Sequence, residues 1–465
     1  MADKIDIIIV GGGPGGYVAA LRAAQLGAKV TLVEKDKLGG VCLNWGCIPT
    51  KALIRTAEVF SLARRGVEFG VVIKDAVVDW GKAQERKQKV VNQLVGGVDK
   101  LLNRAQVQVV KGTGRLASPT AVDVADTTGK TQRLQASKII LATGSVPVAL
   151  PIPGIDNPAV IDSTGALALE SLPESMLIIG GGVIGAEFAS LYNALGVEVT
   201  VVEMLDRLLP LLDATIGEAM KWSFDAHGIV SYLKSKVAKI ESAKTGVVVT
   251  VETPNGVKQI TVEKVLSAVG RRANLSELGL DEIGVRYERG GIKVDDRMCT
   301  NISSIYAIGD AVGGMMLAHL ASRQGEVAAE AIMGHPARMD YRVVPSCIFT
   351  SPEAASVGLS EAEARNRGYQ VKVGMFPLNS NGKALIEGDA DGFVKVVADE
   401  KYGEVLGVHI VGPHASDLIL EPTLGITLEN TVTEFVAAIH PHPTLGEAVA
   451  EAMLAVENRA LHLLR

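Results

Sequence analysis

One segment of this 465-residue chain occurs twice. Residues 5–34 read IDIIIVGGGPGGYVAALRAAQLGAKVTLVE, and residues 176–203 read MLIIGGGVIGAEFASLYNALGVEVTVVE. Three glycines recur 169 residues later without a gap: Gly11, Gly13 and Gly16 in the first copy, and Gly180, Gly182 and Gly185 in the second. Each copy predicts an apolar strand, a glycine turn, a helix and a second strand ending in an acid, Glu34 or Glu203. The duplication therefore predicts an α/β protein with two Rossmann-like domains.

This pattern is the fingerprint of dinucleotide binding in its full βαβ context. The first glycine makes the turn, the second lets the backbone approach a pyrophosphate, and the third lets the helix pack on the strand. The pyrophosphate binds at the helix N-terminus, where free N–H groups favour an anion. Glu34 and Glu203 are placed to accept hydrogen bonds from ribose hydroxyls, and Glu203 would repel a 2′-phosphate, which favours NAD over NADP. A single copy also occurs in ordinary strand–helix packing, but two in register indicate electron transfer between two dinucleotides.

The rest of the chain divides around the two copies. Ala142–Ser145 (ATGS) follows an apolar strand and precedes a proline-rich linker. Asp310 ends a later strand, where it either binds a polyol hydroxyl or caps a helix. Residues 391–412 form two alternating runs around a turn, which predicts a β-hairpin. We expect a first nucleotide domain over 1–150, a second over 151–275, a return to the first over 276–345, and a C-terminal α+β domain over 346–465.

Composition excludes several other classes of protein. The net charge of −6 disfavours binding to nucleic acid or to an anionic membrane, and 4% aromatic residues disfavour a platform for stacked bases. No apolar run approaches the roughly 18 residues of a membrane span. The first strand begins within a few residues of Met1, which leaves no room for a signal peptide. Four cysteines are too few for a disulfide framework, and we expect a cytoplasmic protein.

Two of the cysteines, Cys42 and Cys47, lie in the segment GGVCLNWGCIPTK directly after the first acidic strand end. A zinc site would need a second pair of ligands at close spacing, and none follows, so no metal is expected. Two interpretations of the cysteine pair remain: two buried, inert thiols, or a redox disulfide beside a flavin. Five residues of an ideal helix rise about 7.5 Å, which is beyond the Cα separation of a disulfide. A bond between Cys42 and Cys47 would therefore require a backbone that is distorted or partly outside the helix.

A histidine pair occurs near the C-terminus in IHPHPTLGEA. The prolines that follow them keep His440 and His442 extended, and alternation projects both to the same side, so the pattern does not choose between them. Either histidine titrates in the range needed to accept a thiol proton. Glu447 is placed to fix the tautomer of such a histidine, although it also occupies the capping-box position of the helix that Thr444 begins. A surface histidine without a catalytic role is the alternative for His442.

Over essentially its whole length the chain resembles the flavin- and disulfide-dependent oxidoreductases, and within them it is similar to the dihydrolipoamide dehydrogenase family. The motifs that carry the resemblance occur in the family's order: the first fingerprint, GGVCLNWGCIPTK, ATGS, GGGVIGAE, AVGRRANL, YAIGD and HPHPTLGE. The disulfide segment is the most specific of them. Ala273 stands where proline is usual, but no reactive group is replaced.

The resemblance implies a role for each matching residue. Cys47 is the thiol next to the flavin, and Cys42 is the interchange thiol that reacts with the substrate. His442 is the acid–base residue, oriented by Glu447 and acting at the disulfide of the other subunit, while Lys51 lies near the flavin and pairs with Glu187. The implied FAD-binding residues are Gly11, Gly13, Gly16, Glu34, Lys51, Gly114, Thr143, Gly144, Ser145, Asp310 and Ala318. The implied NAD-binding residues are Gly180, Gly182, Gly185, Glu203, Val237 and Gly270.

The resemblance further implies that a homodimer oxidises protein-bound dihydrolipoamide and reduces NAD⁺, with FAD as the second cofactor. Its partners would be lipoyl domains and the core acyltransferase of 2-oxoacid dehydrogenase complexes, or the H protein of glycine cleavage. Two other functions stay open. One is an NAD(P)H-dependent reductase of another disulfide, similar to glutathione reductase, against which Glu203 argues. The other is an assembly subunit without a catalytic role, against which the complete set of reactive groups argues.

Overall fold

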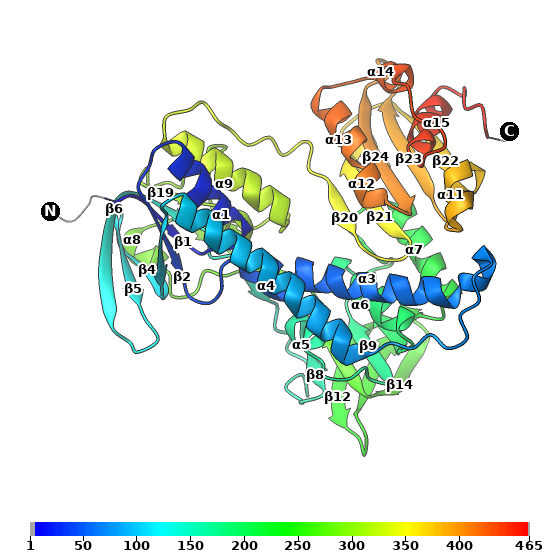
Figure 1. Ribbon diagram of the computed structural model, residues 1–465, viewed down its shortest axis with the longest axis horizontal. Helices are drawn as coiled ribbons and strands as arrows, with labels where there is room; N and C mark the ends of the chain where they lie inside the picture. Colours follow the sequence, from blue (N-terminus) through cyan, green and yellow to red (C-terminus); the bar gives the residue numbers. More distant parts are fainter. Residues whose placement is uncertain (1–4, 464–465) are drawn as a thin grey trace. The chain divides into compact units, whose positions relative to one another are not determined.

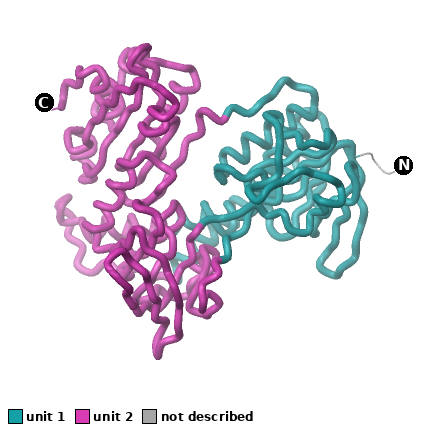
Figure 2. Tube along the Cα trace, turned by 180° about the vertical axis from the view of Figure 1, so that it is seen from behind, with its two compact units in different colours: residues 1–53, 81–149, 270–340 teal, residues 54–80, 150–269, 341–465 magenta. Residues whose placement is uncertain are grey.

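The computed structural model describes residues 5–463. The chain forms two compact units (Figure 2). Unit 1 contains the residues up to 53 together with 81–149 and 270–340, and unit 2 contains residues 54–80, 150–269 and those from 341 onward. Each unit is thus assembled from segments that are distant in the sequence. The four domain boundaries expected from the sequence stay a prediction.

Unit 1 is built on a sheet with the order β3-β2-β1-β6-β5-β4, in which β19 also pairs with β6 (Figure 1). Strands β1, β2, β3, β6 and β19 run parallel, and β4 and β5 are antiparallel additions. The strands of the sheet are β1 (Ile5–Val10), β2 (Val30–Glu34), β3 (Gln108–Lys111), β4 (Thr113–Ser118), β5 (Ala121–Ala125), β6 (Thr131–Leu141) and β19 (Ile305–Ala307). Strand β19 follows the second fingerprint in the sequence but pairs with β6 of this sheet. The chain therefore adds a strand to the first domain after it has formed the second.

Helices of small residues cover this sheet closely. A Cβ atom at Gly325 would come within 2.4 Å of the Gly15 carbonyl oxygen, so two helices, α1 and α9, meet at backbone distance. Alanines at positions 19, 20 and 23 of α1 are fully buried there. The helices that begin or lie in unit 1 are α1 (Pro14–Gln25), α2 (Gly40–Trp45), α3 (Cys47–Arg64), α8 (Leu280–Ile283) and α9 (Ala318–Ile332), with α4 (Trp80–Arg104) starting at its boundary. Short strands β7 (Ser145–Pro147), β16 (Arg271–Ala273), β17 (Tyr287–Glu288) and β18 (Gly291–Ile292) complete it.

Unit 2 repeats the same construction. Its parallel sheet has the order β11-β10-β9-β15-β8, so β9-α6-β10 is the second copy of β1-α1-β2. An antiparallel sheet, β12-β13-β14, follows β11. The strands are β8 (Val160–Ile161), β9 (Ser175–Ile179), β10 (Glu198–Val202), β11 (Val230–Tyr232), β12 (Lys236–Ser242), β13 (Val247–Thr253), β14 (Gly256–Val262) and β15 (Lys264–Ser267). The helices are α5 (Ser163–Leu167), α6 (Val183–Ala194) and α7 (Ala214–Ala226).

The C-terminal part of unit 2 is an antiparallel sheet with the order β20-β21-β24-β23-β22 and helices around it (Figure 1). The hairpin expected over 391–412 is confirmed, since β23 pairs antiparallel with β24. The strands are β20 (Ser346–Ile348), β21 (Glu353–Gly358), β22 (Val371–Pro377), β23 (Phe393–Asp399) and β24 (Val405–Gly412). The helices are α10 (Glu361–Asn366), α11 (Gly382–Glu387), α12 (Ala415–Leu418), α13 (Leu420–Thr427), α14 (Val432–Ala437) and α15 (Glu447–Val456). The predicted fold class, with two Rossmann-like domains and an α+β domain, is confirmed.

Among the described residues, no helix combines the length and the apolar character that crossing a bilayer requires.

Candidate active site

The first and third glycines of each fingerprint have the steric roles expected of them. Gly11 and Gly180 have φ angles of +109° and +107°, in the left-handed region that side chains disfavour. A Cβ atom at Gly16 would lie 1.9 Å from the Gly11 carbonyl oxygen, and the same distance separates a Cβ at Gly185 from the Gly180 carbonyl oxygen. In both copies, therefore, any side chain at the third position would push the helix away from its strand.

The second glycines differ, because they face open space. No heavy atom lies within 4 Å of a Cβ built at Gly182, and the nearest to one at Gly13 is 3.9 Å away. These glycines are the N-caps of α6 and α1, and neither helix end has a side-chain cap. The first N–H groups of two 12-residue helices thus face room that a Cβ would begin to fill, which fits the pyrophosphate of a bound dinucleotide.

The acids at the strand ends are held in equivalent ways. Glu34 accepts hydrogen bonds from the backbone N–H groups of Gly12 and Asp36, each at 2.7 Å. Glu203 accepts from Gly181 N at 2.6 Å and from Leu205 N at 2.8 Å. Both residues are buried. Since each carboxylate oxygen keeps a further lone pair, each acid remains able to accept a hydrogen bond from a hydroxyl group.

Two of the expected FAD residues meet in unit 1 although 165 residues separate them. The Ser145 hydroxyl donates to Asp310 Oδ2 at 2.5 Å and accepts from Arg271 Nε at 2.7 Å. Arg271 also donates to the Ser145 carbonyl at 2.7 Å. Asp310 makes no cap at the 3-10 helix that it belongs to, Gly309–Val312. Sequence reasoning missed Arg271 as a member of this group, although it lies within the AVGRRANL motif.

The remaining expected nucleotide residues occupy the ends of strands and helices. Thr143 donates from its hydroxyl to the Asn274 carbonyl at 2.9 Å, while Gly144 has φ +70° and open space where a Cβ would project. Gly114 on β4 packs against Val10, and Ala318 is the first residue of α9. Two of the expected NAD residues belong to different units. Val237 is a buried residue of β12 in unit 2, and Gly270, with φ +99°, is at the first position of a unit 1 segment.

The helix breaks between the two cysteines. Cys42 lies in α2, which ends at Gly46, and Cys47 is the first residue of α3. Gly46 has φ −138° and ψ −113°, and a Cβ there would approach the Val41 carbonyl oxygen to 3.1 Å. The two thiol side chains are hydrogen-bonded to each other. The backbone between the cysteines therefore has the interruption that a bond between them would require, and the bond itself stays a prediction.

Side chains that sequence reasoning did not select hold this redox segment. Asn44, between the cysteines, donates to the Leu38 and Gly40 carbonyls at 3.0 and 2.9 Å. Thr50 donates from its hydroxyl to the Gly46 carbonyl at 2.7 Å, at the break itself. Both are the short polar residues that bond to nearby backbone, and that composition was the available signal.

The charge environment of Cys42 is mixed. A side-chain hydrogen bond with Cys47, burial and the charge of Cys47 raise the pKa of the Cys42 thiol, whereas the Lys51 ammonium opposes the rise. Lys51 is one turn into α3, so one helix carries both the second cysteine and a cation that acts on the first. Tyr17 lies close enough for Cys42 to raise the pKa of its hydroxyl further, in addition to the effect of burial. Sequence reasoning missed Tyr17, which stands out as an aromatic residue in a helix of glycine and alanine.

The two histidines near the C-terminus have different partners. His442 Nδ1 lies 2.8 Å from Glu447 Oε1, and 80% of the His442 side chain is exposed. His440 is only 12% exposed, and its ring binds the Ala438 carbonyl at 3.1 Å and Glu421 at 3.0 Å. Both ring nitrogens of His440 are thus occupied within the chain, while Nε2 of His442 faces solvent.

Glu447 is held as a carboxylate. Burial opposes its ionisation, but hydrogen bonds from the Thr444 N–H, at 2.8 Å, and from His442 keep the pKa of Glu447 below its usual range. Glu447 thus binds the Thr444 N–H and His442 at the same time. The helix expected to begin at Thr444 begins instead at Glu447 itself, and its N-cap, Gly446, makes no side-chain cap. Glu187, the other expected acid, is buried on α6 and accepts from Phe349 N at 3.1 Å. It lies in unit 2 and Lys51 in unit 1, so their pairing stays a prediction.

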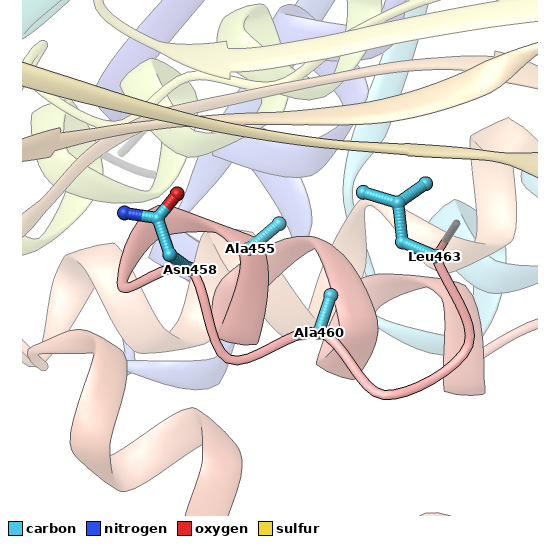
Figure 3. A pocket seen from close by; sticks show the side chains of 4 residues that line it. All are labelled: Ala455, Asn458, Ala460 and Leu463. Carbon is cyan, nitrogen blue, oxygen red and sulfur yellow. The ribbon is translucent and has the colours of Figure 1, made fainter. Parts of the chain in front are cut away.

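No group of three or more potential metal ligands occurs among residues 5–463, and no metal was expected. A surface pocket of about 270 Å³ near the end of the described chain is lined by Ala455, Asn458, Ala460 and Leu463 (Figure 3). None of these residues was expected at the active site.

Comparisons with known proteins agree with this geometry. Residues 5–325 match the family described as pyridine nucleotide-disulphide oxidoreductase, and residues 344–453 match the dimerisation domain of the same family. A dihydrolipoyl dehydrogenase of Bacillus subtilis is 44% identical, with 99% of this chain and all of the relative covered. A dihydrolipoyl dehydrogenase of Zymomonas mobilis is 42% identical at the same coverage.

Solved structures give the same result at lower identity. LpdA from Mycobacterium tuberculosis superposes with a TM-score of 0.90 at 29% identity, covering 97% of this chain and 99% of that one. The HOCl-induced flavoprotein disulfide reductase RclA from Escherichia coli superposes with a TM-score of 0.86 at 27% identity and the same coverage. This chain therefore belongs to the pyridine nucleotide-disulphide oxidoreductase family and, within it, to the dihydrolipoyl dehydrogenases.

Proposed function

We propose that this protein oxidises dihydrolipoamide to lipoamide and reduces NAD⁺ to NADH, using FAD as its bound cofactor. The observation that carries the proposal is the cysteine pair at a helix break, next to the first of two dinucleotide fingerprints. Relatives named dihydrolipoyl dehydrogenase, at 42–44% identity over the full length, support the same reaction. FAD supplies the relay of two electrons between the dithiol and NAD⁺.

The two fingerprints divide the cofactors between them. The glycines from Gly11 to Gly16, with Glu34, would hold FAD, because the cysteine pair follows this copy directly. The open position at Gly182 and the acid Glu203 would hold the pyrophosphate and ribose of NAD. The expected contacts at Gly114, Thr143, Gly144, Ser145, Asp310 and Ala318 belong to the FAD proposal, and those at Val237 and Gly270 to the NAD proposal.

In the dithiol half of the reaction, Cys42 is the point of attack. One sulfur of the substrate bonds to Cys42 Sγ, the Cys42–Cys47 disulfide breaks, and Cys47 leaves as a thiolate. The second substrate sulfur then displaces Cys42, so that the substrate departs as a cyclic disulfide and both cysteines are reduced. His442 accepts the proton of the attacking thiol, passes it to the Cys42 sulfur as that sulfur leaves, and then accepts the proton of the second thiol, with Glu447 orienting its ring through the 2.8 Å contact. Lys51 stabilises the thiolates through its charge.

In the second half, the electron pair leaves the cysteines through Cys47, the thiol that we assign to the flavin side. Glu203 accepts hydrogen bonds from the ribose hydroxyls and so orients NAD⁺ for hydride transfer. Lys51 and Glu187 are assigned to the flavin side of this step. Both cysteines return to the disulfide, the Cys42 proton leaves with the electron pair and ends as part of the hydride on NADH, and the proton left on His442 is released to solvent.

The protein is a homodimer, in line with its dimerisation domain. We infer that His442 acts on the disulfide of the partner subunit. Lipoyl domains, together with the core acyltransferase of 2-oxoacid dehydrogenase complexes or the H protein of glycine cleavage, are the proposed macromolecular partners, since they carry dihydrolipoamide. A cytoplasmic location, close to a pool of NAD⁺, completes the proposal.

The test is NAD⁺ reduction by the purified holoenzyme with dihydrolipoamide as donor and NADP⁺ in a parallel assay. We expect rapid NADH formation that requires the dithiol, and little NADPH. Cys42→Ser and Cys47→Ser should each abolish this reaction and retain FAD. Cys299→Ser is the matched control, because the Cys299 side chain forms a hydrogen bond with Tyr306 and not with another cysteine.

Three outcomes would overturn the proposal. Near-normal turnover by either serine variant would remove the disulfide from the mechanism. A flavoprotein that ignores dihydrolipoamide but oxidises NADH with another disulfide would be a different reductase. Full biological activity of a complex assembled with the Cys47→Ser protein would make the chain an assembly subunit.

A further inference from the structure

A second pocket, of about 320 Å³, lies beside Glu203 in unit 2. Its lining comes from the loop after β10, the turn between β11 and β12, and the end of β13. The lining residues are Met204, Lys234, Ser235, Lys236, Glu252, Thr253 and Pro254. The pocket therefore begins one residue beyond the acid that we assign to the NAD ribose.

The backbone binds the lysines of this pocket directly to the strand end that carries Glu203. Ser235 N donates to the Glu203 carbonyl at 2.9 Å, and Lys234 N donates to the Leu205 carbonyl at 2.8 Å. Lys234 has φ +51°, a left-handed conformation that is uncommon for a residue with a side chain. The turn that presents the lysines is thus attached on both sides of Met204, and it cannot shift without breaking these bonds.

The cations of the pocket are available to a ligand. Lys236 pairs with Glu252 at 3.0 Å, but the two side chains are 61% and 46% exposed, and such a surface pair contributes little. Lys234 has no ion pair among the residues that the structure describes. Glu203 is engaged by two backbone N–H groups instead of by either lysine. Two exposed lysines therefore lie on the turn that is bonded to the strand end of Glu203.

We propose that Lys234 and Lys236 form a subsite for the 2′-phosphate of NADP(H), and that Glu203 alone keeps this subsite from being used efficiently. The proposal rests on the assignment of Glu203 to the ribose of the nicotinamide cofactor. A carboxylate at this position accepts from the 2′-hydroxyl of NAD, whereas a nearby cation accommodates a 2′-phosphate. This chain carries both elements: the carboxylate of Glu203 next to the ribose position, and two lysines beside it, of which Lys236 is shared with the surface carboxylate of Glu252.

The test measures anaerobic reduction of the bound flavin by NADH and by NADPH, which involves no dithiol. The holoenzymes compared are the wild type, Glu203→Gln, and Glu203→Gln with both Lys234→Met and Lys236→Met. Glu203→Gln should raise the ratio of NADPH to NADH efficiency by about a hundredfold. Removing both lysines should then lower the NADPH efficiency by about tenfold without an equal loss for NADH. Higher salt should weaken the NADPH reaction selectively.

Lys239→Met in the Glu203→Gln background is the matched control. Lys239 is another exposed lysine of β12 that pairs with a glutamate, Glu241, at 2.8 Å, and it does not line the pocket. An NADPH to NADH ratio that stays the same after both pocket lysines are removed, or that falls equally with Lys239→Met, would overturn the proposal.

A second measurement applies if Glu203→Gln yields no folded holoenzyme. Adenosine 2′,5′-bisphosphate and AMP are then compared as inhibitors of NADH-dependent flavin reduction in the wild type and in the Lys234→Met/Lys236→Met protein. The bisphosphate alone should lose about fivefold or more in potency, and equal inhibition of both proteins would refute the subsite. If the protein did not oxidise dihydrolipoamide, the test of the phosphate subsite would still be valid. If neither NADH nor NADPH reduced the flavin, the proposed function itself would be overturned.

Discussion

At the scale of single residues, the contacts of the two histidines support our assignment of His442, and not His440, as the proton acceptor. His442 has one ring nitrogen on Glu447 and the other toward solvent, while both nitrogens of His440 are bound. We predict that His442→Gln lowers turnover of dihydrolipoamide by about 10²- to 10⁴-fold, because the thiol proton loses its acceptor. His440→Gln is the control and should stay close to wild type. The measurement is the steady-state rate of NAD⁺ reduction by dihydrolipoamide. An equal loss of this rate in both variants would contradict the assignment of His442.

Candidate active-site residues could be selected from the sequence, but the contacts that surround them could not. Cys42, Cys47 and the fingerprint glycines follow from local constraints of spacing and backbone conformation. Arg271 could not be found in this way, because it joins Ser145 from 126 positions away through a contact made only in the folded unit. The structural difference between His440 and His442 likewise depends on Glu421, 19 positions from His440, and alternation along an extended segment contains no such information.

At the scale of elements, two glycines of the second fingerprint, Gly182 and Gly185, differ in whether the structure has room for a side chain. Gly182 has φ −74° and open space where a Cβ would point, whereas a Cβ at Gly185 would lie 1.9 Å from a carbonyl oxygen. We predict that Gly182→Ala folds normally but slows flavin reduction by NADH by up to about a hundredfold, since the pyrophosphate is displaced. Gly185→Ala should instead lower the thermal midpoint, because β9 and α6 must separate. A Gly182→Ala protein that binds NADH normally would contradict this division.

A buried ion cluster joins helix α7 to the C-terminal sheet within unit 2. Lys395, 4% exposed on β23, binds Asp213 and Glu361 at 3.0 Å each, and Asp213 caps α7 at 3% exposure. Alternation would place a lysine of β23 in solvent, but helix and sheet cover it here. The contact spans 182 positions, so no local pattern could predict it.

We predict that Asp213→Asn destabilises unit 2 by about 3–5 kcal/mol, since it leaves the buried Lys395 charge without the buried one of its two carboxylate partners. Burial would raise the pKa of Asp213, but hydrogen bonds from Thr215 and Lys395 hold it below its usual range. The stability from this carboxylate is therefore present above its unfolded pKa of about 3.9 and lost as the pH falls through the lower folded value. The difference between wild type and variant in denaturant unfolding should be constant from neutral pH to about pH 5 and shrink below pH 4.

Asp225→Asn is the control for this prediction. Asp225 lies on the same helix and pairs with Lys221 at 2.6 Å, but at the surface, where such a pair is worth about 0.3–0.5 kcal/mol. If both variants unfolded at the same denaturant concentration, the buried cluster would have no special contribution to stability.

At the scale of the whole molecule, the proposed role of His442 makes catalysis depend on assembly of the homodimer. Leu420, Leu424 and Leu428 are exposed on α13, and their spacing of four residues puts them on one face. They lie within the part of the chain that matches the dimerisation domain. Since monomers rarely leave such a face in water, we expect the homodimer to cover it. Helix α14 separates α13 from His442 in the sequence, but His440, two positions before His442, binds Glu421 of α13 at 3.0 Å. We therefore expect the region that pairs the subunits also to present the proposed proton acceptor to the partner.

If the active site is shared between subunits, two inactive chains can restore activity in a heterodimer. An active site formed within one chain cannot be restored in this way. A heterodimer of one Cys47→Ser chain and one His442→Gln chain would contain an intact disulfide opposite an intact histidine at one site and two defects at the other. We predict that this heterodimer, purified through two different tags, has about half of wild-type activity, as the two-fold symmetry requires. Each homodimer of a variant chain should be nearly inactive. If instead each chain used its own histidine, every site in the heterodimer would carry one defect, and mixing the chains would restore nothing.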